Sequence, residues 1–452
     1  DVLQLAVDRY SIESLEGLSR ELGLKHPLLD VLDAWDGPEP AYLVVDALDA
    51  TRGGRGEGVF RALIERVLER GGRWNVVASI RNFDLRMGQQ LRALFKGTPP
   101  EVSLVDPAFA EVRHIQIPSW SETEFNELLQ QSPELATCLA QAPRPLRDLA
   151  TVPFNTRLLS ELISGGAVRH LDDVASQADL LHLYWDHRVE GYGLPAKSSL
   201  SRVVDLMVHA RALRAPILQA AGGNPAMIDT LCEEGVLVVV DGGRWVQFRH
   251  HLLFDYAAAR LVLDPGDIVS GAYRFSKRDA LGLMLSPALG FVLRETWESE
   301  TDHARFWIAL GAIINDEDGD PIIRSTAGRL GAEFPISAED CLWLGDPAIT
   351  GDAKVLKTLS HISGALVVRL EDEGQVELAP WAHLADRLAT APATVAGTLR
   401  FLLHNLVERI KDDEFRPMLG RAARGLLASG LAQPEPGFTV RSAIDFVIAT
   451  YE

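Results

Sequence analysis

One apolar run constrains the fold of this chain more than any other stretch. Ala41-Tyr42-Leu43-Val44-Val45 is continuous and apolar, and it ends abruptly in Asp46 and Asp49, followed by Arg52 and two glycines. Such a run is typical of a fully buried strand in a parallel sheet. Ligands of open α/β sheets bind beyond the carboxyl ends of the strands, where a carboxylate beside bound phosphates suits a hydrated Mg²⁺. A turn or helix-capping aspartate would give the same pattern, so the neighbouring segments must decide between the two.

Strand-like and helix-like runs alternate over residues 1 to about 118. Further buried strands are predicted at 2–7, 74–80 and 112–117. Apolar faces at helical spacing occupy 12–22 and 59–68, the second after a glycine loop from Gly53 to Gly58. Because alternating strands and helices form parallel sheets covered by helices, the sequence predicts a three-layer α/β unit over residues 1–118.

The strand predicted at 74–80 ends in Arg81, so a cation and two carboxylates are expected on adjacent strand ends. This combination is what a Mg·phosphate site needs. The carboxylate holds the metal or orients a water, while the guanidinium meets a terminal phosphate oxygen. The alternative is a plain salt bridge at the sheet edge, which contributes little to stability if it is exposed.

Residues 119–194 are predicted to be helical. Ser121 and Glu124 have the spacing of a capping box at a helix start. Pro153 stands where a new helical face begins, a position at which the missing N–H is not needed. Two interpretations remain open for this proline: a contact with a bound base, or a simple first-turn proline.

Residues 195–262 change character. Helical spacing gives way to the apolar run 235–240, a Gly242-Gly243 turn and the run 244–248, which together predict a β-hairpin. Helices followed by a hairpin describe a winged-helix domain, a fold that often binds DNA. This segment holds seven basic and six acidic side chains, a poor electrostatic footprint for DNA. We therefore expect an intramolecular module.

Composition excludes several classes of protein. The chain of 452 residues is too long for a single core. Its net charge of −19 argues against a general nucleic-acid or acidic-lipid binder. Three separated cysteines form neither a disulfide framework nor a metal cluster, and no apolar stretch reaches the ~18 residues of a membrane span. A cytoplasmic location is expected. Because the chain opens on Asp1 inside a strand-like run, it is also expected to be part of a longer protein.

Four segments in order then carry a resemblance to a known class. Leu43-Val44-Val45-Asp46-Ala47-Leu48-Asp49 resembles the Walker B motif of the signal-transduction ATPases with numerous domains, the STAND class that includes NACHT and NB-ARC proteins. The strand ending in Arg81 resembles their sensor strand, and Pro153 matches the proline of their helical lid. The stretch from Phe248 to Arg260 resembles the end of their winged helix, with His250 at the position of its histidine.

The resemblance implies a fold and a set of roles. It implies a P-loop NTPase core at 1–118, a helical lid at 119–194, a winged helix at 195–262 and an α-helical sensor region at 263–452. It further implies that ATP or ADP binds with Mg²⁺, that Asp46 holds the metal and that Asp49 positions the attacking water. By the same resemblance Arg81 senses the γ-phosphate, while Pro153 and His250 contact the nucleotide, His250 as a latch in the resting state.

One departure from the class concerns the phosphate-binding loop. These proteins cradle the phosphates with G-x-x-x-x-G-K-[ST], and this pattern occurs nowhere in the chain. The loop is expected upstream of Asp1, in a segment absent from this sequence together with any effector domain. Natural loss is the alternative. As it stands, the polypeptide is expected to bind nucleotide poorly, and whether it is an ATPase stays open.

Residues 263–452 show repeated Leu/Ala helical faces without a regular sequence period. Short paired helices in series predict an α-solenoid that presents an extended surface to proteins, although a compact helical bundle is the alternative. The Asp316–Asp320 run lacks the glutamate of a calcium loop and is interpreted as a solvated acidic turn.

The complete prediction is an ATP-dependent switch that couples nucleotide exchange to ligand sensing and homo-oligomerisation, in bacterial defence or signalling. A non-enzymatic protein-binding scaffold is the main alternative, and a DNA-binding winged-helix regulator is the third.

Overall fold

The computed structural model describes residues 1–10, 12–51, 55–167, 171, 173–270, 275–372, 377–407, 409, 414–432 and 437–450. The chain divides into two compact units, Asp1–Val262 and Leu263–Glu452, and each is considered by itself. The predicted glycines Gly53 and Gly54 lie outside the described residues.

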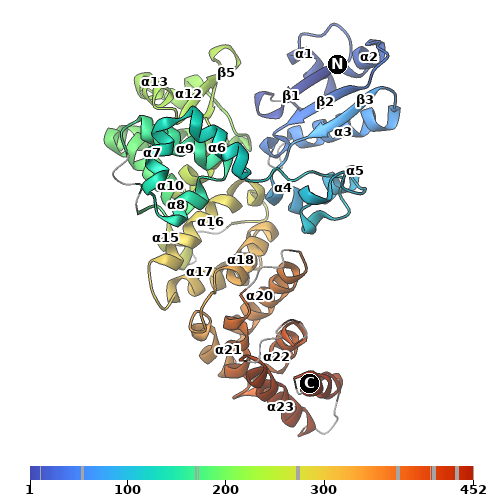
Figure 1. Cartoon of the computed structure of the whole chain (residues 1–452), viewed down its shortest axis with the longest axis vertical. Helices are drawn as coiled ribbons and strands as arrows, with labels where there is room; N and C mark the ends of the chain where they lie inside the picture. Colours follow the sequence, from blue (N-terminus) through green and yellow to red (C-terminus); the bar gives the residue numbers. More distant parts are fainter. Residues whose placement is uncertain are drawn as a thin grey trace. The chain divides into compact units, whose positions relative to one another are not determined.

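The first unit opens with a three-stranded parallel sheet (Figure 1). Its strands are β1 (Val2–Ala6), β2 (Ala41–Asp46) and β3 (Trp74–Ala78), in the order β1-β2-β3. The register pairs Leu5 with Val45 and Val45 with Ala78. The central strand is therefore the apolar run that ends in Asp46, as the sequence predicts.

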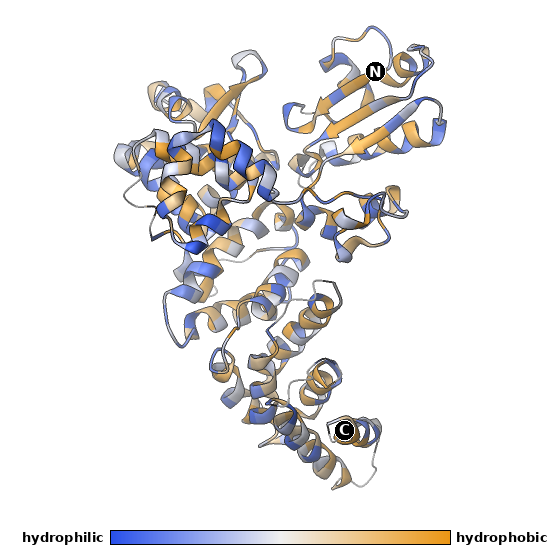
Figure 2. Ribbon diagram, in the orientation of Figure 1, coloured by the Kyte–Doolittle hydropathy of each residue, from blue (hydrophilic) through white to orange (hydrophobic). Residues whose placement is uncertain are grey.

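Among the described residues, helices cover one face of this sheet and leave the other exposed. Leu5, Leu43 and Val45 on the covered face are 0 % exposed. Helix α3 (Arg55–Arg70) buries its apolar side against this face. On the other face, Val2, Tyr42 and Val77 are 63 %, 44 % and 49 % exposed. The prediction of a three-layer unit is therefore wrong for the described residues, which form two layers, although the strands are largely apolar (Figure 2).

Two local predictions in this unit are also wrong. The strand predicted at 112–117 is reduced to a single bridge between Val112 and Lys96. The amides of Arg113 and Gln116 donate to the carbonyls of Phe95 and Leu104 instead of to a neighbouring strand. Helix α3 begins at Arg55, inside the predicted glycine loop, because glycine weakens a helix without forbidding its first turn.

The remaining short elements around the sheet connect its strands and lead to the helical segment. They are η1 (Val7–Arg9), α1 (Leu15–Glu21), α2 (Leu28–Ala34), η2 (Leu48–Thr51), α4 (Asn82–Met87), α5 (Gln89–Leu94), η3 (Val102–Leu104) and η4 (Pro107–Phe109).

The segment after the sheet is helical in its described residues, as predicted. Helix α6 starts at the capping box, where the Glu124 amide donates to Ser121 Oγ and the Ser121 amide donates to the Glu124 carboxylate. Pro153 occupies the first turn of α9 and Leu158 lies in its buried face. The helices are α6 (Glu122–Gln131), α7 (Pro133–Gln141), α8 (Arg144–Leu149), α9 (Pro153–Ser164), α10 (Gln177–Arg188) and α11 (Gly193–Ala210).

A three-stranded antiparallel sheet and a final helix complete the first unit. Its order is β4-β6-β5, and β5 and β6 form the predicted hairpin. The turn needs glycine, since Gly242 and Gly243 have φ angles of 64° and 88°. The elements are β4 (Ala215–Pro216), α12 (Ile217–Ala221), α13 (Pro225–Glu233), β5 (Leu237–Val240), β6 (Trp245–Phe248) and α14 (His251–Leu261).

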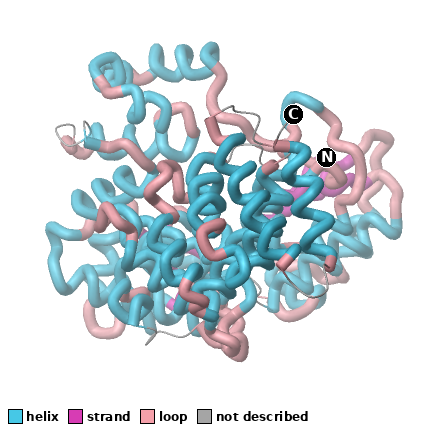
Figure 3. Tube along the Cα trace, turned by 90° about the horizontal axis from the view of Figure 1, so that it is seen from below, coloured by secondary structure: helices cyan, strands magenta, loops and turns pink. Residues whose placement is uncertain are grey.

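Among the described residues of the second unit, helices are joined by turns and loops, with one β-bridge between Ser276 and Gly319. Helices dominate the tube in Figure 3. Neighbouring helices pack in series, for example α18 on α20, α20 on α22 and α22 on α23. None of the described helices is both long enough and apolar enough to cross a bilayer. The helices are α15 (Pro265–Ser270), α16 (Gly282–Glu298), α17 (Ala304–Asn315), α18 (Pro321–Glu333), α19 (Leu342–Ile349), α20 (Ala353–Asp372), α21 (Ala379–Leu388), α22 (Pro392–Leu406), α23 (Arg416–Leu431) and α24 (Phe438–Ala449).

Candidate functional site

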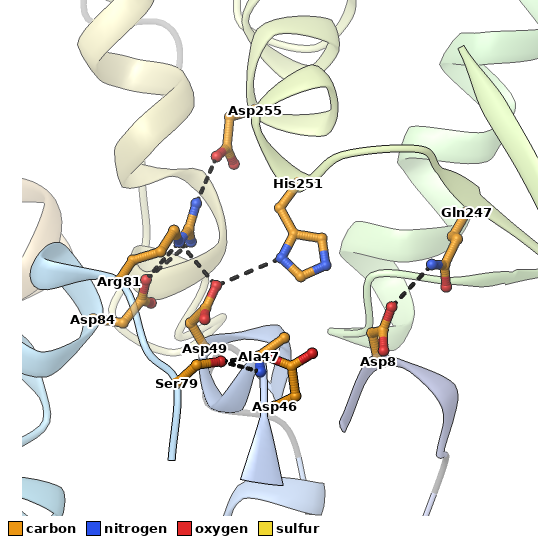
Figure 4. Close-up of polar contacts among 10 residues, drawn as sticks. All are labelled: Asp8, Asp46, Ala47, Asp49, Ser79, Arg81, Asp84, Gln247, His251 and Asp255. Carbon is orange, nitrogen blue, oxygen red and sulfur yellow. Dashed lines mark hydrogen bonds and ion pairs between the residues drawn. The ribbon is translucent and has the colours of Figure 1, made fainter. Parts of the chain in front are cut away.

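The carboxyl ends of β2 and β3 meet the start of α14 at an open cleft of about 570 Å³. Figure 4 draws the polar contacts around it. Three distant segments supply its walls, because the strand ends, the start of α9 and the start of α14 converge here. The lining includes Asp49, Ser79, Arg81, Phe154, His250 and His251. The structure thus brings together three of the residues that the sequence analysis selected: Asp49, Arg81 and His250.

Asp46 is held at the end of β2 by Ser79. The Ser79 hydroxyl donates to Asp46 Oδ1 at 2.6 Å, and the Ala47 amide donates to the same hydroxyl at 2.7 Å (Figure 4). Asp46 itself is not among the residues that line the cleft. Ser79 therefore fixes the orientation of the carboxylate, a positioning role that the sequence analysis did not assign.

The chain is strained directly after Asp46. Ala47 has a φ of 57°, in the left-handed region that is unfavourable for residues with a Cβ. This conformation turns the chain from β2 into η2, which carries Asp49 to the cleft. The strain is local to the turn between the two aspartates.

We expect Ala47→Gly to raise the free energy of unfolding of the first unit by about 0.5–1 kcal/mol, because glycine removes the left-handed penalty but adds freedom to the unfolded chain. Urea denaturation measures the change. Ala50→Gly is the matched control, because Ala50 is buried in η2 and is not in the left-handed region. This variant should lower the free energy of unfolding by about 1 kcal/mol. A loss of the same size at both positions would contradict the prediction.

Arg81 forms ion pairs with three carboxylates. Its guanidinium nitrogens lie 2.9 Å from Asp49, 2.9 Å from Asp84 and 3.0 Å from Asp255 (Figure 4). The three aspartates are 7 %, 7 % and 0 % exposed. Burial disfavours the charged guanidinium, but Asp255, Asp84 and Asp49 outweigh it and raise the pKa of Arg81. The plain exposed salt bridge considered from the sequence is thus a buried network.

This network changes what Arg81 can do in the observed conformation. One guanidinium faces three carboxylates, so the positive charge of Arg81 is engaged by aspartates in this conformation. Arg81 would have to leave Asp255, on α14, before it could meet a phosphate oxygen. The pair of Arg81 with Asp255 therefore links the end of β3 to α14 without a bound ligand.

Other contacts also join the first sheet to the hairpin segment. The Gln247 amide donates to Asp8 at 3.0 Å, and His251 Nδ1 lies 3.5 Å from Asp49 (Figure 4). The buried Arg214 donates to the Arg9 carbonyl at 2.5 Å. The Arg81 network is one of several links between these elements.

His250 forms another part of the cleft wall, just before α14. Its ring meets Phe154 edge-on, with 5.1 Å between the ring centroids. Burial, reinforced by the nearby Arg157 cation, lowers the pKa of His250 to about 4, against the opposing effect of Glu161. Its Nε2 is buried and has no hydrogen-bond partner among the described residues. An unsatisfied buried nitrogen in a cleft wall is suited to a polar ligand atom.

The other two sequence predictions fare differently. Pro153 is a first-turn proline of α9, and its neighbour Phe154, rather than Pro153 itself, lines the cleft. The described residues contain no cluster of three or more His, Cys, Asp or Glu side chains placed to hold a metal. A Mg²⁺ held by Asp46 would therefore need phosphate and water as its other ligands, which is the usual arrangement for this ion.

Sequence reasoning missed Asp84, Asp255 and His251. Asp84 follows Arg81 by three positions and begins a helical turn beside it. Asp255 and His251 stand in the stretch that carries the resemblance, but nothing in a one-dimensional pattern indicates a contact between Asp255 and Arg81, 174 positions apart.

No family model matches this chain, and no curated protein does. The STAND resemblance thus rests on the residues named above.

Proposed function

We propose that residues 1–262 form a nucleotide-dependent switch of the STAND class, with the cleft as its nucleotide site. The observation that carries the proposal is the convergence of Asp49, Arg81 and His250, from three distant segments, on one cleft. In this proposal, residues 1–118 are the NTPase core, 119–194 the lid and 195–262 the winged helix. Residues 263–452 are a solenoid-like sensor for a protein ligand.

The residues would divide the work as follows. Asp46, oriented by Ser79, holds Mg²⁺, which neutralises phosphate charge and bridges phosphate oxygens. Asp49 positions water for hydrolysis. Arg81 exchanges Asp255 for a terminal phosphate oxygen, and this exchange loosens α14. His250 keeps α14 at the cleft through its free Nε2 when a diphosphate is bound.

The proposal requires a phosphate-binding loop, which residues 1–452 do not contain. The sheet has room for further elements of that kind. Its second face exposes Val2, Tyr42 and Val77, and within the described ranges β3 pairs with β2 alone. Parallel sheets are normally covered on both faces, so this face and edge are where a loop-bearing strand and helix would pack.

The rival function is a non-enzymatic scaffold that binds proteins through its helical region. The pairing of Arg81 with three aspartates favours this alternative, since its guanidinium is engaged by carboxylates and not open to phosphate in the observed conformation. In that case the Arg81 network is only a structural link. A DNA-binding regulator is the third candidate, disfavoured by the near-neutral charge of residues 195–262.

The test uses the full-length protein, with fluorescent ADP as the probe. We expect saturable binding that requires Mg²⁺, and ATP hydrolysis that Asp46→Asn abolishes. His250→Ala should release ADP about tenfold faster, because one hydrogen bond to a phosphate is lost. His209→Ala is the matched control, since His209 is exposed in the same unit.

Two outcomes would reject the switch. Absence of Mg²⁺-dependent nucleotide binding would leave the scaffold, and unchanged ADP release from His250→Ala would remove the latch. Retention of duplex DNA by the wild-type protein at low salt would instead support the regulator.

A further inference from the structure

The second unit contains a pocket of about 500 Å³, independent of the cleft in the first unit. Helices α15, α17, α18, α19 and α20 surround it. The volume falls within the range of sites that bury small molecules. Every lining residue lies between Ile268 and Thr358, so the pocket belongs to this unit alone.

The lining is largely apolar and aromatic. Trp307, Phe275 and Leu344 are buried in its walls, while Ile308 remains 42 % exposed and Trp343 is partly exposed. The apolar surface open to a ligand is therefore that of Ile308 and Trp343, and an aromatic ring beside an accessible isoleucine favours a ligand with an apolar body. Such surfaces by themselves do not distinguish one apolar ligand from another.

Arg324 of α18 supplies a charge that would distinguish among apolar ligands. Its Nε is buried without a hydrogen-bond acceptor, and no described residue forms an ion pair or a hydrogen bond with its guanidinium. Burial lowers the pKa of the nearby His361, and the charges of Arg324 and Lys357 lower it further. A guanidinium in such a place is matched by a carboxylate, which accepts two parallel hydrogen bonds.

The acidic residues of the same pocket are already engaged. Asp352 Oδ1 accepts the amides of Lys354 and Val355 at the start of α20, and Asp316 Oδ1 accepts an amide within its own turn. Glu317 lies 3.7 Å from Lys357. None of these three carboxylates satisfies Arg324, and together they repel a ligand of high negative charge.

We propose that this pocket binds a small amphipathic monoanion, whose carboxylate pairs with Arg324 and whose apolar body packs on Ile308 and Trp343. The site is independent of the nucleotide cleft and requires neither Mg²⁺ nor a phosphate-binding loop. It gives the helical region a small-molecule site in addition to any surface for proteins.

Calorimetry of the full chain tests the assignment with 4-phenylbutyrate and octanoate at millimolar concentrations. Both acids should saturate one site, while 4-phenylbutan-1-ol, octan-1-ol and the dianion 1-naphthyl phosphate should bind at least about tenfold more weakly. Arg324→Gln should weaken the two acids by about tenfold or more without affecting the alcohols. Arg305→Gln, an exposed position outside the pocket, is the matched control.

A second variant blocks the apolar part. Gly311 lines the pocket, and a Cβ added there would meet only Thr358 Oγ1, at 3.7 Å. Gly311→Leu should therefore extend into the pocket and abolish binding of the acids, and Gly311→Ala should weaken it while the helix remains folded by circular dichroism. Equal binding of acid and alcohol, undiminished binding by Arg324→Gln, or no saturation by either acid would overturn the proposal.

Discussion

Replacing Arg81 by glutamine lowers the free energy of unfolding of the first unit by about 3–5 kcal/mol, the cost of removing one partner from a buried ion pair. Asp255 is 0 % exposed, and Asp84 and Asp49 are 7 % exposed, so three largely buried carboxylates would lose the cation that they share. Urea-dependent hydrogen exchange, read by mass spectrometry over residues 41–84 and 245–262, confines the measurement to this unit.

The matched control for Arg81→Gln is Arg144→Gln. Arg144 is 86 % exposed and 3.6 Å from Asp148, so its loss should change the free energy of unfolding by less than about 0.5 kcal/mol. Adding Asp255→Asn to Arg81→Gln should recover part of the stability, since the buried carboxylate that has lost Arg81 is replaced by a neutral amide. If Arg81→Gln proved as mild as the control, the buried network would not hold α14 to the strand end.

The second large effect concerns pH and His250. The folded state lowers the pKa of this imidazole from 6.5 to about 4, so its contribution to stability is fully present above pH 6.5. As the pH falls from 6.5 to about 4, His250 becomes protonated in the unfolded state but stays neutral in the folded state, so the free energy of unfolding decreases. Below about 4 His250 is protonated in both states, and the decrease stops.

The size of this loss follows from the pKa difference. If the imidazole were fully buried, the free energy of unfolding would fall by about 3.4 kcal/mol over this interval. Since His250 is only partly buried, solvent screening reduces the expected loss to about 2 kcal/mol. Urea denaturation at several pH values, with the wild-type protein compared with His250→Gln, measures this component separately from other titrating groups.

His209→Gln serves as the reference for the loss of a histidine elsewhere in the same unit, because His209 is exposed. Identical pH profiles for the wild-type protein and His250→Gln would show that the cleft does not disfavour the charged imidazole. The same titration would then remove the reason for regarding Nε2 as a neutral ligand-binding nitrogen.

The sequence alone determined the elements whose signals are local. The apolar run before Asp46 forms β2, the Gly242-Gly243 pair forms the hairpin turn, and Ser121 with Glu124 caps α6. Each of these depends on residues within a few positions, because strand burial, turn conformation and helix capping are short-range properties.

Only the tertiary structure decided the rest. The 112–117 segment had the composition of a strand, but the amides of Arg113 and Gln116 bond to the carbonyls of Phe95 and Leu104, and the segment forms no ladder. Arg81 was predicted to face phosphate, yet it pairs with Asp255 of α14, a residue 174 positions away in the sequence. One face of the sheet stayed open although its strands have the composition of buried ones. Pairing, ion-pair partners and burial depend on segments far apart in the chain, and a local pattern does not specify which segments will meet.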